Sequence, residues 1–155
     1  MDIATADLYD QRGDRLDSLS VPLHDVGGRP AFHGPIRTVR CHRDNALVKA
    51  MLASSGDGAV LVIDGGGSLE SALVGDLIAA SAVDNGWAGI IVHGAVRDRT
   101  AISGLSIGVK ALGFNPRRSA KDGRGEVDVP VEIGGVVFTP GRGVWADPDG
   151  VLVER

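Results

Sequence analysis

The sequence has few aromatic residues and almost no cysteine. Aromatic side chains make up 4% of its 155 residues, and Cys41 is the single cysteine. With so few rings, any hydrophobic core must consist mainly of Val, Ile, Leu and Ala. One cysteine cannot form an internal disulfide, which fits a reducing compartment. Cys41 has no obvious partner base in the sequence, so we expect an inert thiol.

Membrane-spanning and secretory segments are also missing from the sequence. No apolar run approaches the roughly 18 residues that a membrane-spanning helix needs. Residues 1–7 lack the basic and apolar regions of a signal peptide. The net charge of −4 leaves no positive surplus to follow a nucleic-acid backbone. These absences predict a cytoplasmic protein with no membrane association and no direct nucleic-acid partner.

Glycine, in contrast, is abundant. The 23 glycines are about twice the usual share, which predicts many tight turns and close backbone approaches. The length suits one domain with a substantial core. We expect an α/β fold in a single domain over residues 1–155.

Hydrophobic periodicity predicts where the helices and strands lie. Helices are expected over residues 2–19, 45–54 and 69–85, with an interruption of the last one near Gly75. Strands are expected over residues 31–41, interrupted at Gly34-Pro35, and over 59–64, 89–92, 127–131, 136–138 and 150–153. Residues 107–112 fit a helix or a strand equally well. The second half of the chain is therefore expected to be mostly β.

Arg97 and Asp98 are the most informative residues in the sequence. They follow a run that predicts a buried strand and then a glycine turn at Gly94. Arginine can hold a carboxylate through two parallel hydrogen bonds, and aspartate offers the oxygen ligands that hard divalent cations prefer. The pair therefore indicates a small anionic, carbonyl-bearing substrate bound with a metal ion. An ordinary surface ion pair is the alternative.

Gly75 marks a second candidate feature. It interrupts the helical pattern, so a new helix can begin at Asp76. The first N–H groups of a helix lack internal partners and attract carboxylate or phosphate. A helix that leads into an adjacent parallel strand would bring Gly75 and Arg97 to one crevice. A simple break in the helix is the alternative.

Other patterns in the sequence carry weaker predictions. The glycines at 65–67 follow a strand, but they lack the spacing of a dinucleotide-binding fingerprint, so a structural turn is expected; dinucleotide or methyl-donor binding is the alternative. His93 lies close to the proposed site and is more often a packing residue than a ligand. The loop over residues 114–125 is basic but lacks the interleaved aromatics of a nucleic-acid site. Its cations are Arg117, Arg118, Lys121 and Arg124.

Six short motifs occur in one order and together cover nearly the whole chain. They are Gly65-Gly66-Gly67-Ser68, Gly75-Asp76-Leu77, Gly86-Trp87-x-Gly89, Gly94-Ala95-Val96-Arg97-Asp98, Ile107-Gly108-Val109-Lys110-Ala111 and Ala146-Asp147-x-Asp149-Gly150. This ordered set resembles the family of the regulator of ribonuclease activity A and the 4-hydroxy-4-methyl-2-oxoglutarate aldolases. The resemblance implies a compact α/β/β domain, similar to swivelling phosphohistidine domains, that assembles as a ring-shaped homotrimer.

The resemblance also implies roles for the candidate site residues. The backbone amides of Gly75, Asp76, Leu77 and Ile78 would hold the carboxylate and keto oxygen of a small α-keto acid. Arg97 would bind the substrate and offset charge on the enolate, and Asp98 would carry Mg²⁺ or Mn²⁺. Such a site would cleave 4-hydroxy-4-methyl-2-oxoglutarate to pyruvate by a retro-aldol reaction. Oxaloacetate decarboxylation would pass through the same enolate.

A second function stays open at this point. Aldolases of the family often carry an acidic or amide residue three positions after the aspartate, where this sequence has Ala101. Some members also use an acidic residue from a neighbouring subunit, which we do not assign in this sequence. The alternative function is a non-catalytic, protein-binding inhibitor of ribonuclease E. The presence of Asp98, which such regulators can lack, favours the lyase.

Overall fold

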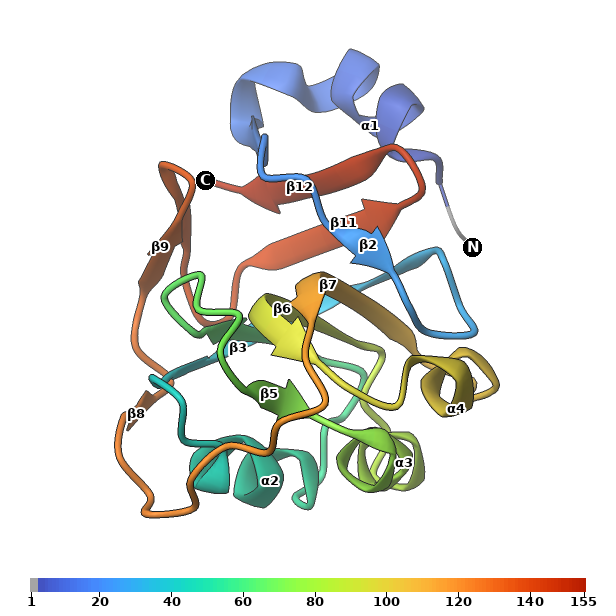
Figure 1. The fold of residues 1–155 in the computed structure, drawn as a ribbon. Helices are drawn as coiled ribbons and strands as arrows, with labels where there is room; N and C mark the ends of the chain where they lie inside the picture. The colour runs from blue at the N-terminus through green and yellow to red at the C-terminus, as the bar shows by residue number, and fades with distance from the viewer. Residues whose placement is uncertain (1–2) are drawn as a thin grey trace.

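Four parallel strands, β3, β4, β6 and β7, form the centre of the fold (Figure 1). The computed structural model describes residues 3–155. Its helices are α1 (Thr5–Arg12), the 3₁₀ turn η1 (Gly13–Arg15), α2 (Ala46–Leu52), α3 (Asp76–Asp84) and α4 (Arg99–Ser103). Its strands are β1 (Leu16–Ser18), β2 (His24–Asp25), β3 (Phe32–Arg40), β4 (Val60–Asp64), β5 (Ala72–Val74), β6 (Gly89–Val96), β7 (Gly108–Phe114), β8 (Glu126–Val127), β9 (Val131–Ile133), β10 (Val136–Phe138), β11 (Gly143–Asp147) and β12 (Gly150–Glu154).

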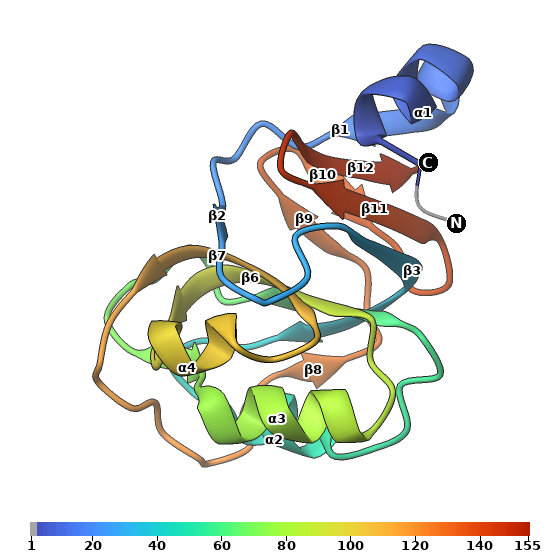
Figure 2. The same cartoon turned by 90° about the vertical axis from the view of Figure 1, so that its right-hand side faces the viewer.

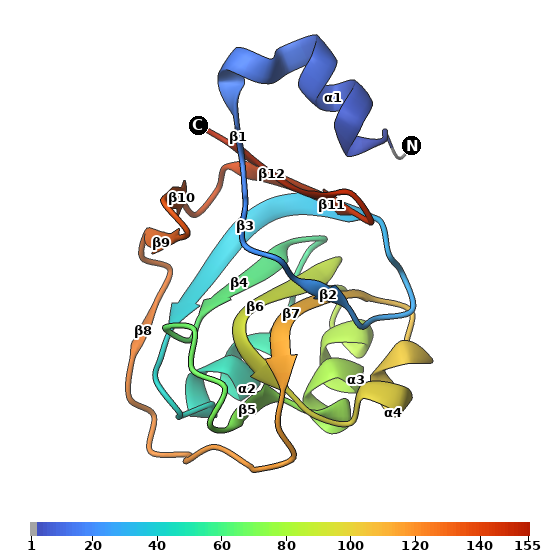
Figure 3. The ribbon, with the colours of Figure 1, turned by 45° about the horizontal axis from the view of Figure 1, so that its top comes forward.

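The strands form one large mixed sheet in the order β1-β12-β11-β3-β4-β6-β7-β2 (Figure 3). Short strands β5 and β8 extend it beside β6 and β3, and β9 and β10 form a separate hairpin. This compact mixed α/β domain confirms the expected fold class. The likeness to swivelling phosphohistidine domains stays a prediction. No helix within residues 3–155 is long and apolar enough to cross a membrane.

Side chains of the central strands alternate between two hydrophobic cores. On β4, Leu61 and Ile63 pack into the core on the helical side, whereas Val60 and Val62 pack into the core against the C-terminal strands. Helices α2, α3 and α4 cover the first face, and the strands after β8 cover the other (Figure 2). A strand buried on both faces needs apolar residues at every position, which explains the continuous apolar run of β4.

Strand β3 runs without a break through Gly34-Pro35, where the sequence predicted an interruption. Its first half pairs antiparallel with β11, and its second half pairs parallel with β4. Gly34 lies at the change of partner, and a Cβ there would sit 2.1 Å from the carbonyl oxygen of Gly58. The glycine therefore permits a close backbone approach, and the proline lies where the pairing changes.

Several sequence predictions need correction in their boundaries or type. The helix expected over 2–19 ends at Arg12, and β1 follows it. Residues 69–74 are not helical, because Ala72–Val74 pairs with β6 as a buried strand. Strand β6 continues through Gly94 to Val96, with an irregular register against β7 instead of a turn. Residues 108–114 form a strand, and neither β11 nor α4 was predicted.

A buried carboxylate fixes the N-terminal helix to the C-terminal hairpin. Asp147 Oδ2 accepts the Thr5 N–H at 2.8 Å, and Oδ1 accepts the Thr5 hydroxyl at 2.7 Å. Oδ1 also accepts the N–H of Asp149 at 3.0 Å. Burial alone would raise the pKa of Asp147, but these hydrogen bonds together hold its pKa below the ordinary value. The contact joins residues that are far apart in the sequence.

We expect Asp147→Ala to lower the free energy of unfolding by about 1–3 kcal/mol, because the Thr5 donors lose their buried acceptor. The ionised carboxylate stabilises the fold above the unfolded-state pKa of about 3.9, and this stability is lost as pH falls through the lower folded-state pKa. The difference in unfolding free energy between wild type and variant should therefore begin to shrink as pH falls below about 4. Asp149→Ala, an exposed neighbour in the same turn, is the matched control. An equal loss of unfolding free energy in Asp147→Ala and Asp149→Ala would contradict the anchoring role of Asp147.

Candidate active site

The unit β5–α3–β6 brings the two candidate segments together. Val74 of β5 pairs in parallel with Val96 of β6, and the Arg97 N–H donates to the Val74 carbonyl at 3.0 Å. Gly75 follows β5 and is the N-cap of α3, which begins at Asp76. The expected proximity of Gly75 and Arg97 is therefore confirmed. It comes from the pairing of two strands rather than from helix packing.

The backbone at Asp98 directs its side chain toward the start of α3. Asp98 adopts a left-handed conformation, with φ 58° and ψ 41°, as the N-cap of α4. Its Oδ2 accepts the N–H of Asp76 at 3.1 Å and lies 3.9 Å from Nε of Arg97. A Cβ at position 75 would lie 2.9 Å from this oxygen. A larger residue at position 75 would therefore require the Asp98 carboxylate to shift from its place over the helix terminus.

Every site residue predicted from the sequence lines one cleft of about 350 Å³. Those residues are Gly75, Asp76, Leu77, Ile78, Arg97 and Asp98. Apolar walls come from Ala53 and Ala72, and Leu77 is 82% exposed at the start of α3. The side chains of Arg97 and Asp98 are about two-fifths exposed, at 42% and 39%, so both can meet a ligand from solvent.

Three further cations in the cleft were not assigned to the site from sequence. Lys49, on α2, and Arg118 and Lys121, from the basic loop, line the same space. The Lys121 ammonium donates to Oδ1 of Asn45 at 3.2 Å. Asn45 is buried and donates in turn to the Leu73 carbonyl at 3.2 Å. With Arg97, the cleft holds four cationic side chains against the carboxylates of Asp76 and Asp98.

The donor set of the cleft fits a hard divalent cation that keeps part of its hydration. Within residues 3–155, no group of three or more His, Cys, Asp or Glu side chains converges on a metal position. Mg²⁺ is commonly held by one or two carboxylates, with water and substrate oxygens completing its shell. Asp98 and Asp76, both on the cleft wall, suit that pattern. Ala101 lies on the exposed part of α4 and adds no oxygen ligand.

The other candidate residues lie outside this cleft. The glycines at 65–67 form a tight turn in which the N–H groups of Gly65 and Gly67 both donate to the His93 carbonyl. A strand rather than a helix follows this turn, so no helix terminus faces it. His93 Nδ1 lies 3.9 Å from Asp64 Oδ1. Burial, with smaller effects of Asp44 and Asp64, raises the pKa of Cys41 to about 12, which is consistent with an inert thiol.

One buried carboxylate organises the loop that carries Lys121. Asp44 is 3% exposed, and its oxygens accept the backbone N–H groups of Ala46, Asp122, Gly123 and Arg124 at 2.9–3.2 Å. Burial alone would raise the pKa of Asp44, but the four N–H donors together lower it. A loop that lacks regular secondary structure is thus held beside the cleft.

Comparison with known proteins identifies the family. Residues 5–153 match the family described as RraA-like, Aldolase/RraA. This chain belongs to that family. Its members include ribonuclease inhibitors as well as aldolases.

Solved structures agree with this assignment at high similarity. A Geobacillus kaustophilus HTA426 protein named as S-adenosylmethionine:2-dimethylmenaquinone methyltransferase is 46% identical, with a TM-score of 0.96 over 98% of this chain and 94% of that one. The RNA-processing inhibitor RraA from Thermus thermophilis is 45% identical, with a TM-score of 0.96 over 99% and 93%. RraAS2 from Streptomyces coelicolor, described as an unusual member of the RNase ES inhibitor RraA family, is 30% identical, with a TM-score of 0.78 over 97% and 79%.

We expect Asp44→Ala to loosen the 121–125 loop more than it destabilises the whole domain. Water can replace the carboxylate at the exposed amides, so the free energy of unfolding should fall by only about 1–2 kcal/mol. Hydrogen exchange at Asp122, Gly123 and Arg124 should accelerate. Asp122→Ala, in the same loop, removes a carboxylate that does not anchor these amides and serves as the control. Unchanged exchange in Asp44→Ala would contradict the anchoring role.

Proposed function

We propose that the protein is a divalent-metal-dependent carbon–carbon lyase that acts on a small α-keto acid. The observation that carries this proposal is the meeting, in one cleft, of a helix N-terminus, an arginine and two carboxylates. The substrate we propose is 4-hydroxy-4-methyl-2-oxoglutarate, cleaved to pyruvate by a retro-aldol reaction. Oxaloacetate decarboxylation is the proposed side activity, because both reactions leave the same pyruvate enolate.

Substrate binding is assigned to the backbone and to Arg97. Gly75, Asp76, Leu77 and Ile78 line the cleft at the start of α3, where the helix dipole favours a carboxylate. A substrate carboxylate would take the place of the side-chain oxygens that now accept the N–H groups of Asp76 and Leu77. The Asp98 carboxylate, which accepts one of these N–H groups, marks that place as suited to an anion. Arg97 would hold the keto acid and offset negative charge as the enolate develops.

The metal site is assigned to Asp98, with Asp76 beside it. Bound Mg²⁺ or Mn²⁺ would act as a Lewis acid on the keto group of the substrate. The Asp98 carboxylate is oriented by the hydrogen bond that its Oδ2 accepts from the Asp76 N–H, so less of its side-chain freedom is lost on binding a ligand.

The balance of charge in the cleft favours a substrate with more than one carboxylate. Four cationic side chains face two carboxylates, and a metal ion would add further positive charge. Lys49, Lys121 and Arg118 lie beyond the start of α3 and can meet the second carboxylate of a dicarboxylic keto acid. Both proposed substrates carry two carboxylates.

The second candidate function is a protein-binding inhibitor of ribonuclease E. The 45% identical Thermus protein, named as an RNA-processing inhibitor, favours it. This function needs no metal and no small substrate. We propose a homotrimer for either function, in keeping with the family resemblance. Turnover by the purified protein distinguishes the two functions.

Asp98→Ala should abolish metal-dependent turnover without unfolding the domain. The protein is first treated with a chelator and then resupplied with Mg²⁺ or Mn²⁺. Pyruvate is then measured from each of the two substrates. Activity should depend on the metal in wild type and be at least about 100-fold lower in the variant, the loss of several kcal/mol of transition-state stabilisation. Full Mg²⁺-dependent turnover by folded Asp98→Ala would refute the metal assignment. No turnover by wild type with either metal would favour the inhibitor.

Arg97→Lys should separate substrate binding from metal binding. Lysine keeps the charge but loses the planar pair of donors, so kcat/KM should fall roughly 10- to 100-fold. Mn²⁺ affinity, measured by calorimetry, should change little because arginine offers no metal ligand. Loss of Mn²⁺ affinity with unchanged kcat/KM would show that Arg97 acts at the metal site and that its assignment to substrate binding is wrong.

A further inference from the structure

A second cleft, separate from the candidate active site, lies on the other side of the basic loop. Its volume is about 410 Å³. It is lined by the segment after β3, by Ser71 and by the loop that leads to β8. The cationic side chains of this cleft that we consider are Arg43, Arg117 and Arg124, with His42 beside them.

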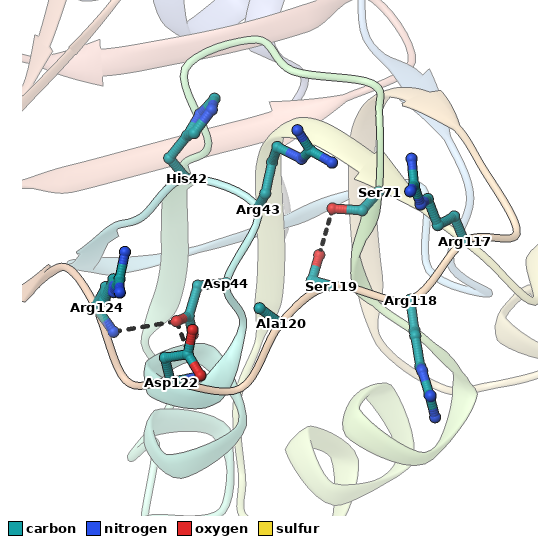
Figure 4. Close-up of a pocket in the computed structure, with 10 residues that line it drawn as sticks. All are labelled: His42, Arg43, Asp44, Ser71, Arg117, Arg118, Ser119, Ala120, Asp122 and Arg124. Atoms are coloured by element: carbon teal, nitrogen blue, oxygen red, sulfur yellow. Dashed lines mark hydrogen bonds between the residues drawn. The ribbon is translucent and has the colours of Figure 1, made fainter.

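These three arginines face one side of the loop. Figure 4 shows Arg43, from the segment after β3, and Arg117 and Arg124, from the basic loop, pointing in the same direction, whereas Arg118 points the opposite way, toward the helices. Arg118 is thereby directed to the candidate active site, which it also lines. The other three arginines belong to the second cleft and do not line the first.

Arginines outnumber carboxylates in the second cleft, whose lining includes the carboxylates of Asp44 and Asp122. Within residues 3–155, no carboxylate lies within salt-bridge distance of Arg117 or Arg124. Arg43 pairs with Glu70 at 3.3 Å, and the Glu70 side chain is 65% exposed. Asp44 is buried and occupied by four backbone donors. Such a set of cations attracts a ligand with several negative charges.

The backbone beneath the arginines is held in place. The Ala72 N–H donates to the carbonyl of Arg117 at 2.7 Å, and the Ala120 N–H donates to the carbonyl of Arg43 at 2.9 Å. Arg124 is anchored through its own N–H by Asp44. Because all three backbones are fixed, less ordering is needed when a ligand binds than at a free loop.

The hydroxyl groups on the floor of the cleft do not offer protons to a ligand. Ser119 Oγ donates to the Ala72 carbonyl at 2.7 Å. It therefore accepts, at 2.7 Å, the hydroxyl proton of Ser71. Both protons are used within the protein, so recognition of an anion falls to the guanidinium groups. Guanidinium groups present paired donors that match carboxylate and phosphate oxygens.

We infer that this second cleft is a binding site for a small polyanion, either a phosphate ester or a polycarboxylate. The ligand bridges the guanidinium groups of Arg43, Arg117 and Arg124. It displaces Glu70 from Arg43, because a ligand with several charges outcompetes one exposed carboxylate. The site does not depend on the lyase chemistry proposed above.

Calorimetric titration of the whole protein with pyrophosphate and with citrate tests this inference. Saturable binding of either probe is expected. Higher affinity for pyrophosphate would indicate a phosphate ester as the ligand, and higher affinity for citrate would indicate a polycarboxylate. Arg117→Gln and Arg124→Gln should each weaken binding about tenfold, the loss of one charge-assisted contact. Arg142→Gln, an exposed arginine outside both clefts, is the matched control and should leave affinity unchanged. Affinity should fall with added salt.

Two further variants locate the bound anion. Glu70→Gln should tighten binding several-fold by freeing Arg43, a gain that damage to the fold would not produce. Arg97→Gln should leave unchanged the binding that Arg117→Gln weakens, because Arg97 lines only the candidate active site. Three results would overturn the inference. They are loss of this binding in Arg97→Gln, a loss of affinity in Arg142→Gln equal to that in Arg117→Gln and Arg124→Gln, and no saturable binding of either probe.

Discussion

The pairing of the short strand β5 with β6 is the constraint on which the candidate site depends. Ala72 and Val74 lie opposite Ala95 and Val96, and all three β5 residues are buried. This pairing fixes where α3 begins and sets its first N–H groups beside the end of β6. Three buried residues thus align two segments of the candidate site, those of Asp76 and Asp98, which lie 22 positions apart in the sequence. Rigid strand ends position side chains more accurately than free loops.

The sequence predicted the helices and strands whose local propensity matches their burial in the fold. The apolar run of β4 fits a strand buried on both faces, and the helical spacing after Asn45 fits α2. The positions of glycines and charged residues in the sequence also predicted that Gly75 and Arg97 share a crevice. Local pattern is sufficient in these places because one structure satisfies both the propensity and the burial of the segment. The roles assigned to these residues stay predictions.

The sequence did not predict features that long-range pairing decides. Ala72–Val74 fits a helix by spacing, but it becomes a strand because β6 offers it a free edge. Lys49 and Asn45 carry no local signal of a site, since their place in the cleft depends on how α2 packs. Arg118 and Lys121 were recognised only as part of a basic loop. Arg117 and Arg124 of that loop line only the second cleft, Lys121 lines only the candidate active site, and Arg118 lines both.

The pairing of β1 with β12 has a consequence for how the protein is made. Leu16 lies opposite Glu154, and Thr5 is held by Asp147, so α1 and β1 rest on strands that are synthesised more than 120 residues later. On the ribosome, α1 and β1 must wait without their partner surface until β11 and β12 emerge from the exit tunnel. The central parallel strands can form beforehand, because β3 to β7 precede that point. Docking of α1 and β1 therefore follows the synthesis of β11 and β12, and a nascent chain stalled before β11 would leave α1 and β1 accessible to chaperones.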